Sequence, residues 1–195
     1  MREIEILVEM HDSADIVEEK VRTVAEFVRE GITKDIYYYD PLRKEQFFLK
    51  RGQFLQSFRV RAQGGKTYLT HKRDIFNSDD TWSYSEELEI EVMDGEKMQQ
   101  ILEVLGFKKL IDLQINKKTF RADNLLIDIE QVPGIGLFLE VEATDVPDDE
   151  RVEDVKQRIR KFIDTLGIQA GQELQIGKAE HALIKKHGSA WFDVM

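Results

Sequence analysis

The sequence predicts an α+β fold built around a large antiparallel β-sheet. Eight segments alternate polar and apolar residues with a period of two, and three longer segments carry apolar residues at helical spacing. Most of the alternating segments are separated by short turns, and strands joined by short turns pair antiparallel. We therefore expect the strands to form one sheet, with the helices outside it.

The helical segments each end in a glycine that an apolar residue follows. The first is expected from Ala14 to Arg29, where Asp12 or Ser13 can cap its start and Gly31 its end. The other helices are expected at about 95–105 and 150–166, with a shorter one at 178–186.

The alternating segments define the candidate strands. Between two of them lies the pair Gly64-Gly65, which is typical of a tight β-hairpin because glycine adopts the positive φ angles that such turns need. The strands are expected near 2–9, 36–40, 54–63, 66–73, 84–92, 110–121, 124–131 and 136–143.

Acidic residues recur two apart in several of these strands, with an apolar residue between them. Residues two apart share a face of a strand, so Glu87 and Glu89 would point to one side and Leu88 and Ile90 to the other. Like charges side by side are unfavourable unless an opposite charge lies between them. The apolar residues expected beneath the helices are Ile4, Ile6, Leu88, Ile90, Ile127, Ile129, Leu139 and Val141.

The charged face has two interpretations that spacing alone leaves open. On an open sheet it is a solvated face, and its acidic side chains pair with lysine or arginine on neighbouring strands. In a sheet that curls into a barrel it lines a lumen, which Arg59, Arg61 and Lys72 would share. Clustered carboxylates suit a hard divalent cation, and arginine and lysine in the same space suit a polyphosphate. This lumen would favour metal-assisted cleavage of a phosphoanhydride.

Composition restricts the function further. The net charge of -10 argues against a general binder of nucleic acid or of an anionic membrane, and the lack of cysteine excludes disulfides and thiolate metal sites. No apolar run approaches the roughly 20 residues that span a bilayer, so we expect a cytoplasmic protein. With three prolines and no glycine- or serine-rich tract, the chain is expected to form one domain over 1–195. A homodimer is left open.

The charged segments resemble, in order, the motifs of the CYTH superfamily, the triphosphate tunnel enzymes that include class IV adenylate cyclases and thiamine triphosphatases. The first of them, Glu3-Ile4-Glu5, resembles the family's ExExK signature. The similarity continues through Asp35-Ile36-Tyr37-Tyr38 for D-x-Y-F, Phe58-Arg59-Val60-Arg61 for L-R-x-R, Leu69-Thr70-His71-Lys72 for L-T-x-K, Glu87-Leu88-Glu89 for the middle E-x-E, Asp128 for a late aspartate, and Gly134 to Glu142 for G-x-G-x-F-x-E-x-E. The motif-bearing part is therefore about 1–145, and the C-terminal helices occupy 148–195.

This resemblance implies an eight-stranded antiparallel β-barrel, or tunnel, with helices packed outside. It also implies a triphosphate ligand, such as ATP, thiamine triphosphate or inorganic triphosphate, bound with Mg²⁺ or Mn²⁺. The metal ligands it implies are Glu3, Glu5, Glu87, Glu89, Asp128, Glu140 and Glu142. The phosphate-binding residues it implies are Arg59, Arg61, Lys72 and Lys117.

One departure from the family pattern affects the expected activity. The lysine of ExExK falls on Leu7, and the loss of a charge-assisted contact to phosphate would cost about 1.5 to 3 kcal/mol of binding. Lys66 or Arg121 is a candidate to replace it. The expected function is phosphoanhydride chemistry on a triphosphate, either ATP to cyclic AMP and pyrophosphate or triphosphate hydrolysis. The alternatives are a catalytically weakened nucleotide or polyphosphate binder, and a structural barrel with a solvated charged face.

Overall fold

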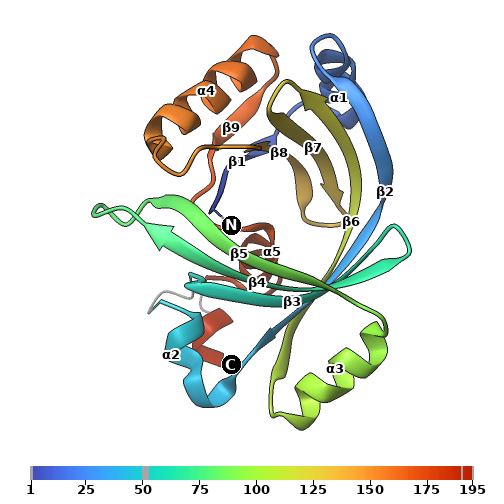
Figure 1. The fold of residues 1–195 in the computed structure, drawn as a ribbon, viewed down its shortest axis with the longest axis vertical. Helices are drawn as coiled ribbons and strands as arrows, with labels where there is room; N and C mark the ends of the chain where they lie inside the picture. The colour runs from blue at the N-terminus through green and yellow to red at the C-terminus, as the bar shows by residue number, and fades with distance from the viewer. Residues whose placement is uncertain (1, 50–52, 190, 195) are drawn as a thin grey trace.

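A computed structural model describes residues 2–49, 53–189 and 191–194, and it confirms the α+β class and the antiparallel barrel (Figure 1). Strands β1 to β8 pair in the order β5-β4-β3-β2-β6-β7-β8-β1, and β1 also pairs with β5, which closes the barrel. The closing pairs are Arg2 with Glu86 and Glu3 with Ser85. The strands are β1 (Arg2–Met10), β2 (Glu26–Tyr39), β3 (Gln56–Gln63), β4 (Lys66–Phe76), β5 (Trp82–Val92), β6 (Lys108–Ala122), β7 (Leu125–Val132) and β8 (Gly136–Ala143), with a short β9 (Ala170–Glu173) beside β1.

The other three predicted helices lie close to their expected positions, whereas η1, α2 and η2 were not predicted. Asp94 accepts a hydrogen bond from the backbone nitrogen of Lys97 at the start of α3, and Gly106 and Gly167 follow α3 and α4 with φ angles of 90° and 60°. Gly64 and Gly65 also have positive φ, as the predicted hairpin requires. The helical elements are α1 (Ala14–Arg22), η1 (Pro41–Arg43), α2 (Lys44–Phe47), α3 (Gly95–Val104), α4 (Val152–Thr165), α5 (Lys178–His187) and η2 (Trp191–Val194). No helix in the described part of the chain is long and apolar enough to cross a membrane.

The prediction of a first helix from 14 to 29 was wrong in its second half. Helix α1 ends at Arg22, and β2 starts at Glu26 and pairs with β6 along almost its whole length. Phe27 therefore lies on a strand, where its ring packs edge-on against Phe120. Gly31 lies inside β2 and does not end a helix. Pairing with β6 outweighs the helical spacing of the local sequence.

The predicted apolar face is confirmed on three strands, β1, β7 and β8, and wrong on β5. Helix α4 covers β1 and β8, and α1 covers β7, so the apolar residues there are buried. Leu88 and Ile90, in contrast, are 70% and 64% exposed, because α3 packs over β3 and leaves this part of β5 uncovered. The residues confirmed in the core are Ile4, Ile6, Ile127, Ile129, Leu139 and Val141.

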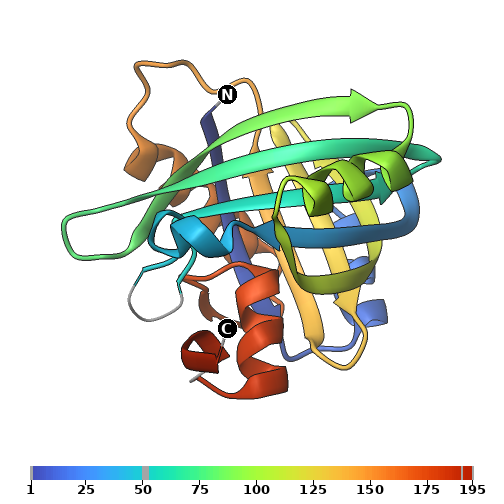
Figure 2. The same ribbon diagram turned by 90° about the horizontal axis from the view of Figure 1, so that it is seen from below.

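Helix α5 closes one end of the barrel interior. Its Ala182 and Leu183 pack in an apolar cluster with Leu7 and Phe138, which extend the inward-facing rows of β1 and β8. In Figure 2, α5 and the C-terminal η2 lie together below the strands. The interior beyond this cluster is therefore reached from the opposite end, where the β3–β4 hairpin turns at Gly64.

Candidate functional site

The inward-facing side chains of the barrel surround a cavity of about 370 Å³. Nine acidic and six basic side chains line it, so carboxylates are in excess. All eleven side chains that the sequence analysis assigned to metal or phosphate lie along this cavity. The lining ionisable residues are Glu3, Glu5, Arg29, Arg59, Arg61, Lys72, Asp74, Glu87, Glu89, Lys117, Asp128, Glu140, Glu142, Lys178 and Glu180.

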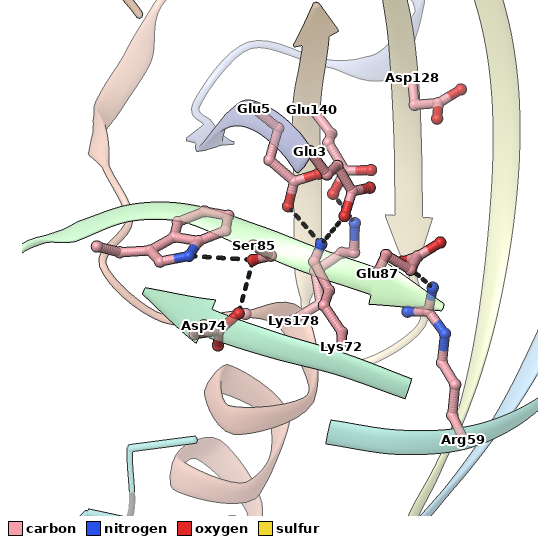
Figure 3. A network of polar contacts seen from close by, with 12 residues as sticks. Glu3, Glu5, Arg59, Lys72, Asp74, Ser85, Glu87, Asp128, Glu140 and Lys178 are labelled. Carbon is pink, nitrogen blue, oxygen red and sulfur yellow. Dashed lines mark hydrogen bonds and ion pairs between the residues drawn. The ribbon is translucent and has the colours of Figure 1, made fainter. Parts of the chain in front are cut away.

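Lys72 joins β4 to β1 across the lumen. Its Nζ lies 2.8 Å from Oε2 of Glu3 and 3.1 Å from Oε1 of Glu5, as Figure 3 shows. Burial alone would lower the pKa of Lys72, but the two glutamates and Glu140 raise it well above its ordinary value. Lys72 therefore carries a positive charge that is already paired with carboxylates.

A second lysine, Lys117, neutralises the carboxylates on β7. Its Nζ lies 2.6 Å from Oδ2 of Asp128 and 2.8 Å from Oε1 of Glu130. The hydroxyl of Thr119 donates a hydrogen bond of 2.5 Å to Oδ1 of Asp128. Burial would lower the pKa of Lys117, and Glu130 and Asp128 raise it. Both oxygens of Asp128 are thus held by neighbours on β6.

A third lysine, Lys178 at the start of α5, reaches into the lumen and pairs with Glu130 and Glu140. The side chains of Asp128, Glu130 and Glu140 each place an oxygen within 4.8 Å of the others. Burial would raise the pKa of Glu140, but Lys178 and Lys117 hold it well below its usual range. This corner of the cavity therefore contains three close carboxylates bridged by two ammonium groups.

The arginines of β3 are positioned by Asp35 on β2. Arg61 makes a bidentate pair with it, with Nε–Oδ1 and Nη2–Oδ2 distances of 2.8 and 2.7 Å. Arg59 lies 3.8 Å from Asp35 and 3.8 Å from Glu87, and it donates a hydrogen bond to the hydroxyl of Tyr37. Burial would raise the pKa of Asp35, but Arg61 and Arg59 lower it. The bidentate pair fixes the plane of the Arg61 guanidinium.

Negative charge is in excess where β1, β8 and β5 face one another. Burial, followed by the charges of Glu3 and Glu140, raises the pKa of Glu142 to about 8. Glu89 accepts a hydrogen bond of 2.8 Å from the hydroxyl of Thr70. Several carboxylate oxygens in a buried cavity are the donors that hard divalent cations prefer. The residues present therefore fit Mg²⁺ or Mn²⁺.

The structure brings Lys178, Asp35 and Glu130 into the site, and the sequence analysis assigned a role to none of them. Two of the three could have been recognised from their spacing. Asp35 lies two residues before Tyr37 and Glu130 lies two residues after Asp128, and residues two apart on a strand share a face. Lys178 had no comparable signal, since it lies on a short helix outside the motif-bearing segment.

Lys178 also brings a positive charge close to Leu7, the position at which the family motif has a lysine. In the pairing of β1 with β8, Leu7 lies opposite Glu140, the carboxylate to which Lys178 binds. Leu7 itself is 2% exposed and packs against the apolar side of α5. The two candidates from the sequence lie outside this cavity: Lys66 pairs with Glu91 near the β3–β4 turn, and Arg121 is exposed.

The start of α5 is held in place by a buried carboxylate. Glu180 accepts hydrogen bonds of 2.6 Å from the backbone nitrogen of Gly177 and 2.7 Å from that of Phe54. Burial raises the pKa of Glu180 to about 8 despite these two donors. Glu180 thereby ties the helix to the segment that leads into β3 and sets the position of Lys178.

Comparison with known proteins agrees with this architecture. A family model described as the CYTH domain matches residues 1–175. The chain is 27% identical over 165 residues to "Putative adenylate cyclase MJ0240" of Methanocaldococcus jannaschii, a match that covers 84% of this chain and 90% of that protein. The solved structure of PH1819 from Pyrococcus horikoshii has a TM-score of 0.74 at 24% identity, covering 94% of this chain and 99% of that one.

A plant structure shows the same fold. It is described as that of "Putative adenylyl cyclase HpAC1" from Hippeastrum, with a dominant triphosphatase activity. Its TM-score is 0.64 at 18% identity, and the match covers 95% of this chain and 96% of that one. The family model spans all the strands of the barrel and the acidic and basic rows that line it. The chain therefore belongs to the CYTH family.

Proposed function

We propose that the protein is a metal-dependent enzyme that hydrolyses a phosphoanhydride bond of a triphosphate compound. The observation that carries the proposal is the cavity itself, in which cations and carboxylates alternate around a space open at one end. An ordinary solvated sheet face does not bury its charges, whereas Glu5, Lys117 and Glu130 are each less than a tenth exposed. Charges buried in opposite pairs around a cavity suit a ligand that carries both signs, such as a metal triphosphate.

The basic side chains would hold the phosphates. Arg59 and Arg61 present guanidinium groups on β3, and Lys72, Lys117 and Lys178 present ammonium groups from three other elements. Guanidinium groups bind phosphate oxygens in pairs, and ammonium groups act as point charges. Five cations around one cavity can contact several phosphate oxygens of a triphosphate, while a divalent metal offsets the carboxylates that pair with them.

The acidic side chains would hold the metal. We assign this role to Asp128, Glu130 and Glu140, whose oxygens already lie together, and to the neighbouring carboxylates Glu3, Glu5, Glu87, Glu89 and Glu142. When bound, Mg²⁺ or Mn²⁺ supplies charge neutralisation of the phosphates and polarises the attacking oxygen. The barrel excludes bulk water from these charges, which strengthens every electrostatic contact in the lumen.

The closed end sets the direction in which a triphosphate enters. The apolar cluster under α5 blocks one end, and a second cavity of about 320 Å³ continues from the first past Tyr68 toward the turn at Gly64. The terminal phosphate would therefore lie deepest, beside Lys178, and an organic group would remain near Tyr68. This orientation favours attack by water at the buried end.

Cyclisation of ATP is a second candidate, because the chain is similar over most of its length to a protein named as an adenylate cyclase. In that reaction the ribose hydroxyl attacks the α-phosphorus and pyrophosphate leaves. The enzyme would then have to place the α-phosphate, instead of the terminal phosphate, beside the metal.

One experiment ranks these functions. Purified protein is incubated with ATP, thiamine triphosphate or inorganic triphosphate in Mg²⁺ or Mn²⁺, and phosphate, pyrophosphate and cyclic AMP are measured. Arg61→Met should lower triphosphate affinity at least tenfold by loss of a charge-assisted contact. The matched control is Arg73→Met, on the next strand, whose side chain pairs with Glu86 at the surface. Metal-dependent binding without turnover would indicate a polyphosphate binder, and no binding of any triphosphate would refute the proposal.

A further inference from the structure

Three buried lysines each bridge two carboxylates in or directly beside the cavity. Lys72 lies between Glu3 and Glu5. Lys117 lies between Asp128 and Glu130, and Lys178 lies between Glu130 and Glu140. The side chains of Lys72, Lys117 and Lys178 are only 14%, 9% and 10% exposed. All three ammonium groups are therefore paired with carboxylates before any ligand enters.

This pairing makes either ligand costly to bind alone. A divalent cation that takes Glu130 and Glu140 must displace Lys178 and leave a buried ammonium without a partner. A triphosphate that takes Lys178 must leave Glu140 buried without its ion-pair partner and Glu130 with Lys117 alone. When both ligands are present, the carboxylates turn to the metal and the ammonium turns to the phosphate, and no charge is left unpaired.

We propose that the metal ion and the triphosphate bind this cavity cooperatively, because each takes the partner that the other releases, and that Lys178 is the main residue that couples them. The inference rests on the proposed function and states how its two ligands depend on each other. Coupling of this kind is reciprocal, so each ligand raises the affinity of the other by the same factor.

Lys178 is better placed for this exchange than the other two lysines. Lys72 contacts none of the three carboxylates whose oxygens lie together, whereas Lys117 and Lys178 each bind two of them. Lys117 lies within β6 between its two partners on β7, but Lys178 is the first residue of α5 and reaches in from the end of the barrel. Glu180 holds the backbone of the helix start through two hydrogen bonds, so the ammonium moves by rotation of its own side chain. Lys178 pairs with Glu140, which lies opposite Leu7, and so supplies its charge from the closed end of the barrel.

The test is a pair of titrations with a single ligand each, which avoids complex formation between metal and triphosphate in solution. Calorimetry with Mn²⁺ alone should show about tenfold tighter binding to Lys178→Met than to the unmodified protein, within the usual range of coupling. Calorimetry with inorganic triphosphate alone, in a chelator, should show about tenfold weaker binding to the same variant. The two changes have opposite signs, which a general loss of structure would not produce.

Two control variants separate this exchange from a general change in the electrostatic potential of the cavity. Arg61→Met removes one positive charge from the same cavity but not from the cluster around Glu130, and it should raise Mn²⁺ affinity less than threefold. Arg73→Met removes an exposed partner of Glu86 and should leave both affinities unchanged. Lys178→Gln, which keeps a hydrogen-bond donor, is the second variant should Lys178→Met fold poorly.

A crystallographic comparison tests the exchange without substitution. With Mn²⁺ and triphosphate bound, Nζ of Lys178 should contact a phosphate oxygen, and Glu130 or Glu140 should contact the metal. Unchanged Mn²⁺ affinity in both Lys178 variants, or a ternary complex in which Lys178 stays on its carboxylates, would overturn the inference while triphosphate binding upheld the proposed function. Failure of the unmodified protein to bind triphosphate with or without Mn²⁺ would overturn both.

Discussion

Leu7→Lys restores the cation that the first strand of the family motif would carry, yet we expect no gain in activity from it. Leu7 lies opposite Glu140 in the barrel wall, and the ammonium of Lys178 already occupies that carboxylate. A second ammonium beside it adds repulsion in a nearly closed space. The substitution should therefore leave triphosphate affinity and turnover within about threefold of the unmodified protein, far less than a whole charge-assisted contact would add.

The same substitution has a measurable effect on stability. Burial of a leucine side chain contributes roughly 1.5 to 3 kcal/mol, and the stem of a lysine keeps part of that contact. Since Leu7 is 2% exposed, we expect a loss of about 2 kcal/mol in the free energy of unfolding. For a chain of this size that corresponds to a fall in Tm of roughly 4 to 8 °C. Leu7→Met, which changes shape but not charge, should cost less than about 1.5 kcal/mol.

The decisive assay is a double-mutant cycle. Triphosphate affinity and phosphate release are compared in the unmodified protein, Leu7→Lys, Lys178→Met and the double variant. Lys178→Met should lose about 1.5 to 3 kcal/mol of binding in the presence of metal, or roughly 10- to 150-fold, and Leu7→Lys should recover part of this only in the double variant. A tenfold gain from Leu7→Lys alone would refute the reasoning, because it would show that Lys178 does not fill the missing position.

Three further predictions test the electrostatics and the packing of the barrel. Asp35→Asn should destabilise the protein by about 3 to 5 kcal/mol at pH 7, because it breaks a buried ion pair with Arg61. Since the pKa of Asp35 is held below its ordinary value of 3.8, its stabilisation is present above that pH and is lost as the pH falls below it. Urea unfolding at pH 7 and pH 3.5 should show the difference shrinking at the lower pH, and a constant difference would contradict the assignment. Ile127→Ala should cost about 2 to 5 kcal/mol whereas Leu88→Ala should cost less than about 0.5, a contrast that equal losses would disprove. Metal removal by a chelator should abolish turnover but leave Tm unchanged, because lysines such as Lys72 already neutralise the carboxylates; a large fall in Tm would show that the metal is structural.

The sequence pattern predicted the strands well because alternation directly reports which face of a strand is charged. The charged faces on β1, β3, β5, β7 and β8 all point into the lumen. Where the pattern failed, long-range pairing decided the outcome. Val24, Phe27 and Val28 have helical spacing, but the strand that contains the last two is fixed by β6, about 90 residues later in the chain.

The composition of the site was only partly predictable for a related reason. A spacing of two identifies neighbours within one strand, so Glu3 with Glu5 and Arg59 with Arg61 could be recognised. It carries no information on which element reaches into the barrel from its end. Lys178 is one of several lysines in the C-terminal segment, and the packing of α5 in the apolar cluster of Leu7, together with the hydrogen bonds of Glu180, directs it inward. The exposure of Leu88 was likewise not predictable from spacing, because it depends on which strands the helices cover.

The narrow seam between β1 and β5 has a consequence for how the chain folds. Strand β1 leaves the ribosome before its partners: it pairs along most of its length with β8, about 130 to 140 residues later in the chain, and with β5 through two pairs. Long-range pairing of this kind is slow, so β1 waits unpaired while most of the chain is synthesised. An apolar strand with free edges would be prone to aggregate during that time. Glu3 and Glu5, which later line the lumen, give the waiting strand the charge that keeps it in solution, so the same two carboxylates serve the protein before it has a cavity at all.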